Sequence, residues 1–238
     1  MDIGKAFGFV FEDEKWITKV LIGGLLIWIP VVNFAVFGYM LTVAENVSRG
    51  VARPLPEWSN FGDLFMRGLN YFIITLVYQI PTLIVACIVG SIAAGFGASL
   101  ESNPDSSAAN GLLGVVACLY PLLIVMAIIL AMASYPAIAR YIQTGSLGEA
   151  FKFGDSFASL RNNLGTWVIL ILVAILASFV GQLGAIACGV GALFTLTYAQ
   201  FVNGHALGQT MIKLGMGNTT IGEYSPPTTP LDPPPAYR

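Results

Sequence analysis

The chain has 238 residues, of which 56% are apolar and 10% are charged. Soluble domains are typically about 45–50% apolar and about 25% charged, so these proportions exclude an ordinary water-soluble globule. The formal net charge of -2 also excludes the basic surface that a nucleic-acid partner would need. The composition therefore predicts a membrane protein whose immediate surroundings are lipids.

Four stretches without Asp, Glu, Lys or Arg are long enough to cross a bilayer core of about 30 Å, which takes roughly 20 helical residues. These stretches are Val20–Ala44, Gly68–Leu100, Ser106–Ala139 and Asn162–Ile212. The fourth is long enough for two helices, and we expect the reversal at Gly181–Gly184, where two glycines permit a tight turn. A polar loop from Glu101 to Ser107 separates the second stretch from the third.

The first stretch, Val20–Ala44, is either one kinked span or a short hairpin that reverses at Ile29–Asn33. We expect the hairpin because it places all 11 Lys and Arg residues on one side of the membrane. The positive-inside rule makes that side the cytoplasm. The inbound segment Trp16–Ile29 would measure only about 21 Å as a helix, which is short enough to be re-entrant.

An aromatic-glycine pattern precedes each predicted hairpin, at Phe7–Phe11, Phe61–Phe65 and Phe153–Phe157, and the last two share FGDxF. The pattern indicates three repeated units, each with an amphipathic segment at the membrane interface. A chance match is the alternative, since the chain holds 15 Phe and 26 Gly. We predict an all-α polytopic membrane bundle of about six helices over residues 1–215, built as three hairpins.

Three further stretches carry a family resemblance: Trp16 through LLIWIP to GYMLTVAENVSRG, then RPLPEWSNFGDLF, and later TYAQFVNGHALGQ. They resemble a family of bacterial and archaeal multi-pass membrane proteins that carries only a domain-of-unknown-function label. The resemblance covers Phe7–Gln209, and its most specific part is LPEWxxFGDLF, Leu55–Phe65. A looser likeness is to the membrane domain of some bacterial glycerophosphodiester phosphodiesterases, whose catalytic barrel is absent here. Neither likeness carries over a catalytic residue.

Few residues of the chain offer chemistry. The single histidine, His205, would suit a proton relay or a ligand, but a metal site needs several convergent ligands. Cys87, Cys118 and Cys188 lie in apolar stretches without CxxC spacing, where we expect them to be small buried side chains. Hydrolase, metalloprotease and nucleotide-binding signatures are missing. We therefore expect no enzyme activity and no cofactor.

Polar side chains near the ends of the three return helices occupy equivalent positions of the repeat. They predict either a cytoplasmic cluster that clamps the helices together, with Glu45 paired to Arg140, or ordinary interfacial groups. The candidate residues are Glu45, Asn46, Arg140, Gln200, Asn203 and His205.

Residues 216–238 are rich in proline and predict a disordered cytoplasmic tail. Its end includes Pro234, Pro235 and Tyr237, the PPxY pattern that WW domains recognise, so the tail is either a partner motif or a flexible extension. Helices rich in small residues favour a scaffold or accessory subunit that packs against other membrane proteins in the cell membrane, with both termini cytoplasmic. A small permease or channel is the alternative, which the repeats and helix-breaking prolines would suit.

Overall fold

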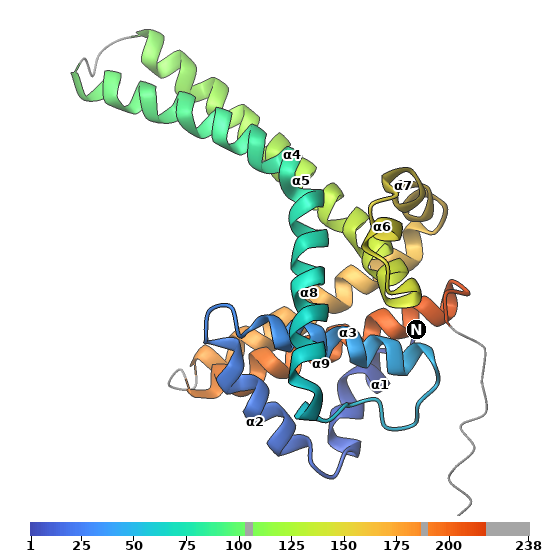
Figure 1. Ribbon diagram of the computed structural model, residues 1–238. Coiled ribbons are helices and arrows are strands. Elements are labelled where there is room, and N and C mark those ends of the chain that lie inside the picture. The colour runs from blue at the N-terminus through green and yellow to red at the C-terminus, as the bar shows by residue number, and fades with distance from the viewer. Residues whose placement is uncertain (103–106, 187–189, 218–238) are drawn as a thin grey trace, which may run out of the picture.

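The computed structural model describes residues 1–102, 107–186 and 190–217, and the regular structure in these ranges is helical (Figure 1). The elements in chain order are α1 (Ile3–Gly8), the 3-10 turn η1 (Phe9–Glu12), α2 (Trp16–Ile27), α3 (Phe34–Ser48), the 3-10 turn η2 (Trp58–Asn60), α4 (Phe61–Ser102), α5 (Ser107–Thr144), α6 (Leu147–Ala150), α7 (Phe153–Asn162), α8 (Leu164–Ile186) and α9 (Val190–Lys213). The predicted all-α class is confirmed. The end of the tail, with Pro234, Pro235 and Tyr237, lies outside the described residues.

Three segments of the described chain are helical, long and apolar enough to cross a membrane. They are Trp58–Gly95, which is largely α4, Ala117–Thr144 in α5, and Leu164–Gly184 in α8. The apolar helix α2 is shorter, and α9 is not among the three. These helices confirm a membrane protein.

The reversal predicted at Ile29–Asn33 is present, because α2 ends at Ile27 and α3 begins at Phe34. Val31 in this turn has a positive φ of 71°, a backbone conformation that valine rarely adopts. The two helices do not form a close antiparallel pair, since α2 lies mainly against α9. A Cβ added at Gly24 of α2 would overlap the Leu193 carbonyl oxygen of α9, so the two backbones touch.

The reversal predicted at Gly181–Gly184 is wrong, because α8 continues through these residues to Ile186. Gly184 instead allows close packing of two helices: a Cβ there would meet the carbonyl group of Gly191 in α9. The Thr195 hydroxyl also donates a hydrogen bond of 2.7 Å to the Gly181 carbonyl oxygen. The glycines therefore serve a contact between α8 and α9.

The three aromatic-glycine segments adopt different structures. Phe7–Phe11 covers the junction of α1 and η1, and Phe153–Phe157 begins the separate helix α7. The segment Phe61–Phe65 is not a separate interfacial helix, because it continues directly into the long helix α4. The internal repeat stays a prediction.

Glycines also set the contacts of α3 with its neighbours. A Cβ added at Gly204 of α9 would overlap the Met40 carbonyl oxygen, and one added at Gly208 would approach the Ala44 carbonyl oxygen to 2.6 Å. Helices in membranes associate through such small residues, which let backbones approach closely. The core between these helices contains fully buried aromatic side chains, including Tyr39 and Phe201, whose ring centroids lie 4.5 Å apart.

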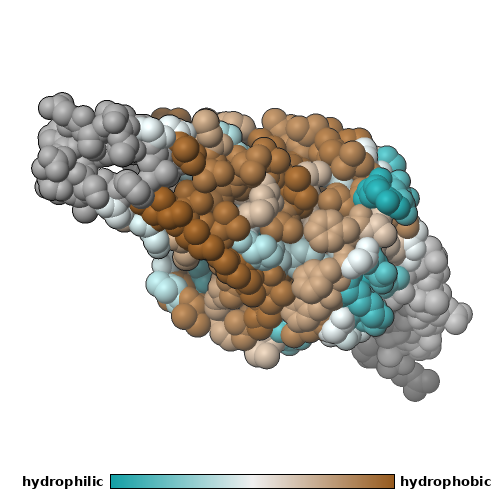
Figure 2. Space-filling view, turned by 90° about the horizontal axis from the view of Figure 1, so that it is seen from above, coloured by the Kyte–Doolittle hydropathy of each residue, from teal (hydrophilic) through white to brown (hydrophobic). Residues whose placement is uncertain are grey.

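The outer halves of α4 and α5 lie side by side and extend away from the other helices (Figure 1). Both helices bend, and both contain internal proline: Pro81 in α4, and Pro121 and Pro136 in α5. Proline removes a backbone donor and crowds the preceding turn, which bends a helix. We call this projecting pair the α4–α5 arm. Figure 2 shows that apolar residues cover most of the upper face of the molecule.

Candidate functional site

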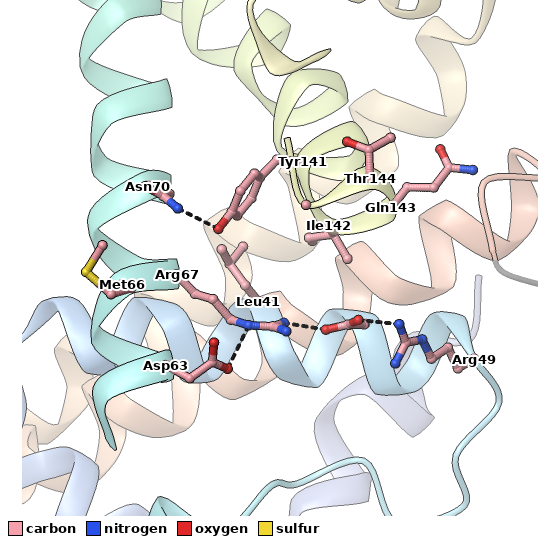
Figure 3. A pocket seen from close by; sticks show the side chains of 12 residues that line it. Leu41, Arg49, Asp63, Met66, Arg67, Asn70, Tyr141, Ile142, Gln143 and Thr144 are labelled. Atoms are coloured by element: carbon pink, nitrogen blue, oxygen red, sulfur yellow. Dashed lines mark hydrogen bonds and ion pairs between the residues drawn. The ribbon is translucent and has the colours of Figure 1, made fainter. Parts of the chain in front are cut away.

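A cavity of about 430 Å³ opens where the ends of three helices meet (Figure 3). The C-terminal parts of α3 and α5 and the first turns of α4 supply its walls, and we call it the junction cavity. Its lining residues are Leu41, Glu45, Arg49, Asp63, Met66, Arg67, Asn70, Tyr141, Ile142, Gln143, Thr144 and Gly145. The cavity therefore combines charged, polar and apolar side chains at one end of two of the candidate spans.

A network of ion pairs centred on Glu45 forms one wall of the junction cavity. The Glu45 carboxylate accepts from the Arg67 guanidinium and from Arg49 Nη2, the latter at 2.6 Å. Arg67 Nε lies 3.0 Å from Asp63 Oδ2. The Glu45 side chain is only 11% exposed, whereas those of Arg49 and Asp63 are 51% and 61% exposed. The two arginines thus neutralise the two carboxylates, of which only that of Glu45 is buried.

The facing wall of the cavity joins α4 to α5 through a polar contact. Asn70 Nδ2 donates a hydrogen bond of 2.8 Å to the hydroxyl oxygen of Tyr141, a buried residue. Helix α5 ends close by at Thr144, and Gly145 follows with a φ of 69°, which glycine adopts without strain. The polar end of α5 is therefore held against the first turns of α4.

The predicted pairing of Glu45 with Arg140 is wrong. Arg140 Nη1 instead lies 3.1 Å from Asp155 Oδ2 of α7. Successive residues of a helix point about 100° apart, so Tyr141 faces the junction cavity while its neighbour Arg140 reaches a different helix. The carboxylate of Glu45 is already occupied by Arg67 and Arg49.

The remaining candidates of the predicted polar cluster have separate surroundings. Asn46 Nδ2 donates to the Pro54 carbonyl oxygen at 2.9 Å. Gln200 is half-buried on α9, and Asn203 Oδ1 is buried without a hydrogen-bond partner. The residues do not gather into one site. The charged residues that line the junction cavity beside Glu45 are instead Arg49, Asp63 and Arg67. In the sequence, these residues are marked only by opposite charges spaced four residues apart, at Glu45/Arg49 and Asp63/Arg67.

His205 helps to hold the amino terminus. Its ring stacks on Phe9, with centroids 4.3 Å apart, and its Nδ1 lies 3.1 Å from Gln209 Nε2. The Gln209 amide binds the Asp2 backbone at both ends, accepting from its N–H at 2.6 Å and donating to its carbonyl at 3.0 Å. Burial and, to a smaller extent, the charge of nearby Lys5 lower the pKa of His205 to about 4, against an opposing effect of Asp2. His205 is therefore neutral near pH 7 and accepts a hydrogen bond from Gln209.

The most specific part of the family resemblance surrounds a buried lysine. Lys19 Nζ donates to Asp13 Oδ2 at 2.8 Å and to the Leu55 carbonyl oxygen at 3.0 Å, and lies 3.3 Å from Glu57 Oε1. Burial raises the pKa of Asp13, but hydrogen bonds from the Lys19 ammonium and the Lys15 backbone, together with the charges of Lys19 and Arg53, outweigh this effect, so the pKa lies below its usual value. We call these contacts the Lys19 brace. They fasten α2 to the connection between α3 and α4.

Aromatic residues complete the Lys19 brace. Trp58 Nε1 donates to the Lys19 carbonyl oxygen at 3.1 Å, and the Trp58 ring stacks on Tyr39 with centroids 4.4 Å apart. The Tyr39 hydroxyl donates to the Pro56 carbonyl oxygen at 2.8 Å. The LPEW sequence is thus a structural element that positions α4 for its contact with α3.

The cysteines do not match the expectation of burial. Cys87 of α4 and Cys118 of α5 are free and exposed on the α4–α5 arm, while Cys188 lies outside the described residues. Thiols are compatible with this position because they are weakly polar and suit an apolar, lipid-facing surface. Among the residues that the structure describes, no three His, Cys, Asp or Glu side chains are grouped to hold a metal ion.

Apolar helices of spanning length, with an ion-pair network where helix ends meet, define an integral membrane protein. The chain belongs to the family described as "Protein of unknown function (DUF4013)", whose family model matches residues 21–190. This match confirms the resemblance to a domain-of-unknown-function family. No curated protein and no solved structure matches the chain, so nothing supports the likeness to glycerophosphodiester phosphodiesterases.

Proposed function

We propose that this protein is a non-enzymatic, multi-pass membrane scaffold or accessory subunit of the cell membrane, and that the α4–α5 arm is the surface that binds other membrane proteins. The exposure of this arm carries the proposal. In the most apolar windows of α4 and α5 only 17% and 11% of the residues are buried, compared with 33% in α8. A lateral surface of this kind is available to a neighbouring transmembrane helix.

A groove along the arm supports the same role. It has a volume of about 670 Å³, and small residues line much of it: Ala86, Gly90, Ala93, Ala127 and Ala131. Gln79 Nε2 donates to the Ala127 carbonyl oxygen at 3.2 Å and ties the two helices together near the base of the groove. Small residues allow a further helix to approach closely, which is the usual mode of association in membranes.

The distribution of basic residues supports an orientation with both termini in the cytoplasm. The turn from Trp28 to Asn33, before α3, contains no Lys or Arg, whereas Arg49 directly follows the other end of α3 and Lys213 is the last residue of α9. Basic residues favour the cytoplasmic side of a membrane. Thiol labelling of intact cells would test the orientation, with the three native cysteines replaced by serine and a single cysteine placed at residue 2 or at residue 30. We expect labelling from outside at residue 30 alone.

Site-specific photo-cross-linking in native membranes tests the scaffold role. A cross-linker at Ile88, on the exposed surface of the arm, should capture a specific membrane protein that copurifies with the chain. A matched cross-linker at Phe179, which is also apolar and exposed but lies on α8, should not capture it. Identical products from both positions, or capture of lipid alone from Ile88, would contradict a binding role for the arm.

A permease is the second candidate, since both helices of the arm contain internal prolines and the amide of Gln79 lies within an apolar span. Purified protein in liposomes would distinguish the two functions. Solute flux by the isolated chain, abolished by Gln79→Leu, would favour transport. A stable native companion without such flux would favour the scaffold.

A further inference from the structure

We infer that the junction cavity binds the head group of a zwitterionic phospholipid that carries a primary ammonium, of the phosphoethanolamine type. The inference concerns a different surface from the α4–α5 arm and does not depend on the scaffold role. It rests on the charge balance of the cavity, on the exposure of the individual charged side chains and on the position of the cavity along the spanning helices.

The position of the junction cavity corresponds to the level of lipid head groups. Its residues Asp63 and Arg67 come just before the uncharged stretch that begins at Gly68, and Tyr141 to Thr144 come just after the uncharged stretch that ends at Ala139. Because the ends of spanning helices lie at the boundary between hydrocarbon and water, an open polar cavity there faces the head-group layer. Met66, which is exposed at the cavity, provides an apolar contact beside it.

The charges of the junction cavity favour a ligand without net charge. Arg49 and Arg67 balance Glu45 and Asp63, so a purely anionic or cationic ligand would leave one charge of the cavity uncompensated. A zwitterion brings both signs and preserves the balance. The negative group of a zwitterion would meet the two arginines, and its positive group would meet the two carboxylates.

Each end of the head group has a suitable partner. Arg49 is half-exposed and shares Glu45 with Arg67, so its guanidinium can turn to a phosphate while Glu45 keeps its second arginine. Asp63 is largely exposed, and the negative end of the α5 dipole lies at Thr144, so both favour an ammonium. A primary ammonium can also donate hydrogen bonds to these oxygens, which a trimethylated ammonium cannot do.

Lipid retention by the purified full-length protein tests the inference. The protein in detergent is exchanged with phosphatidylethanolamine, phosphatidylcholine or phosphatidylglycerol of identical acyl chains, and bound lipid is counted by native mass spectrometry. We expect phosphatidylethanolamine to bind about tenfold more tightly than either of the others, which corresponds to about 1.4 kcal/mol. Equal retention of the three lipids would overturn the inference.

Exposed charges of the cavity provide variants that should fold. Asp63→Asn should remove the preference for phosphatidylethanolamine over phosphatidylcholine, and Arg49→Gln should lower the affinity for both about fivefold or more. The control is Arg53→Gln, because Arg53 is an exposed arginine that pairs with Glu14 and does not line the cavity. Wild-type retention and preference in both cavity variants would refute the assignment.

Competition identifies the source of the ligand. Water-soluble glycerophosphoethanolamine should displace the bound lipid, because it carries the same phosphate and ammonium. Inorganic phosphate at the same concentration should not, since it offers the negative charge alone. Displacement by inorganic phosphate with equal efficiency would show a simple anion site and overturn the zwitterion assignment.

Discussion

Gly38 of α3 faces Gly68 of α4 at the crossing of the two helices, with no side chain of either residue between the backbones. A Cβ added at Gly38 would overlap the Leu64 carbonyl oxygen, and one added at Gly68 would overlap the Phe34 carbonyl oxygen. Because both obstacles are backbone atoms, neither can be relieved by a rotamer change. The two glycines therefore fix the distance between α3 and α4, and with it the geometry of the junction cavity.

Gly38→Ala should destabilise the protein by about 2–3 kcal/mol, since the added methyl group forces the helices apart. Gly62→Ala is the control, because Gly62 has open space around its Cα and lies near the start of α4, the helix that α3 crosses at Gly38. The control should be neutral or stabilising by up to about 1 kcal/mol, as alanine favours helix over glycine. Thermal unfolding in detergent, followed by circular dichroism, measures both; equal melting temperatures would contradict the close crossing.

Lys19→Met should destabilise the protein by about 3 kcal/mol, because it removes the cation that neutralises the buried Asp13 carboxylate. Lys15→Met changes an exposed lysine of the same segment and should alter stability by less than about 0.5 kcal/mol. Limited proteolysis provides a second measurement, since loss of the Lys19 brace should expose the connection between α3 and α4 to cleavage. Unchanged melting and proteolysis in Lys19→Met would show that the brace contributes little.

The stability of the protein should fall as the pH is lowered from about 6.5 to about 4. The pKa of His205 in the folded state is lowered to about 4, from an ordinary value of 6.5, so in this range the unfolded chain binds a proton that the folded chain excludes. Above pH 6.5 the imidazole is neutral in both states and has no such effect. His205→Gln should flatten this part of the pH profile of unfolding; an identical slope in the variant would assign the pH dependence to other groups.

A double-mutant cycle should show which arginine is coupled to Glu45. Glu45→Gln and Arg67→Gln each remove one partner of the same ion pair. The change in the free energy of unfolding of the double variant should therefore differ from the sum of the two single changes by about 1–3 kcal/mol. Glu45→Gln and Arg140→Gln should be additive within about 0.5 kcal/mol, because Arg140 pairs with Asp155. The free energies of unfolding of the single and double variants give both coupling energies. Coupling of Glu45 to Arg140 alone would contradict the observed network.

The sequence predicts the helical class from its composition, the family from segments such as LPEWxxFGDLF, and the reversal before α3 from a local break at Pro30. It does not predict the partner of Glu45, since Arg67 reaches it only through the crossing of α3 and α4. Gly184 was misleading for a physical reason: glycine serves both tight turns and close helix packing, and only the position of α9 distinguishes the two. Asp63 lies within the recognisable FGDLF segment and Arg67 lies just after it, but the role of both charges depends on contacts between helices.

The short helix α2 also affects the surrounding lipids. Its 12 residues measure about 18 Å, well below the roughly 30 Å of a hydrocarbon core. The turn that follows exposes Trp28, Ile29 and Val31, whose apolar side chains suit the boundary between the acyl chains and water. Lipids beside this turn face a reduced hydrophobic thickness, and matching it requires local thinning at a cost of a fraction of a kcal/mol per ångström. The hydrophobic mismatch thus favours thin bilayers with short or unsaturated chains around this side of the protein.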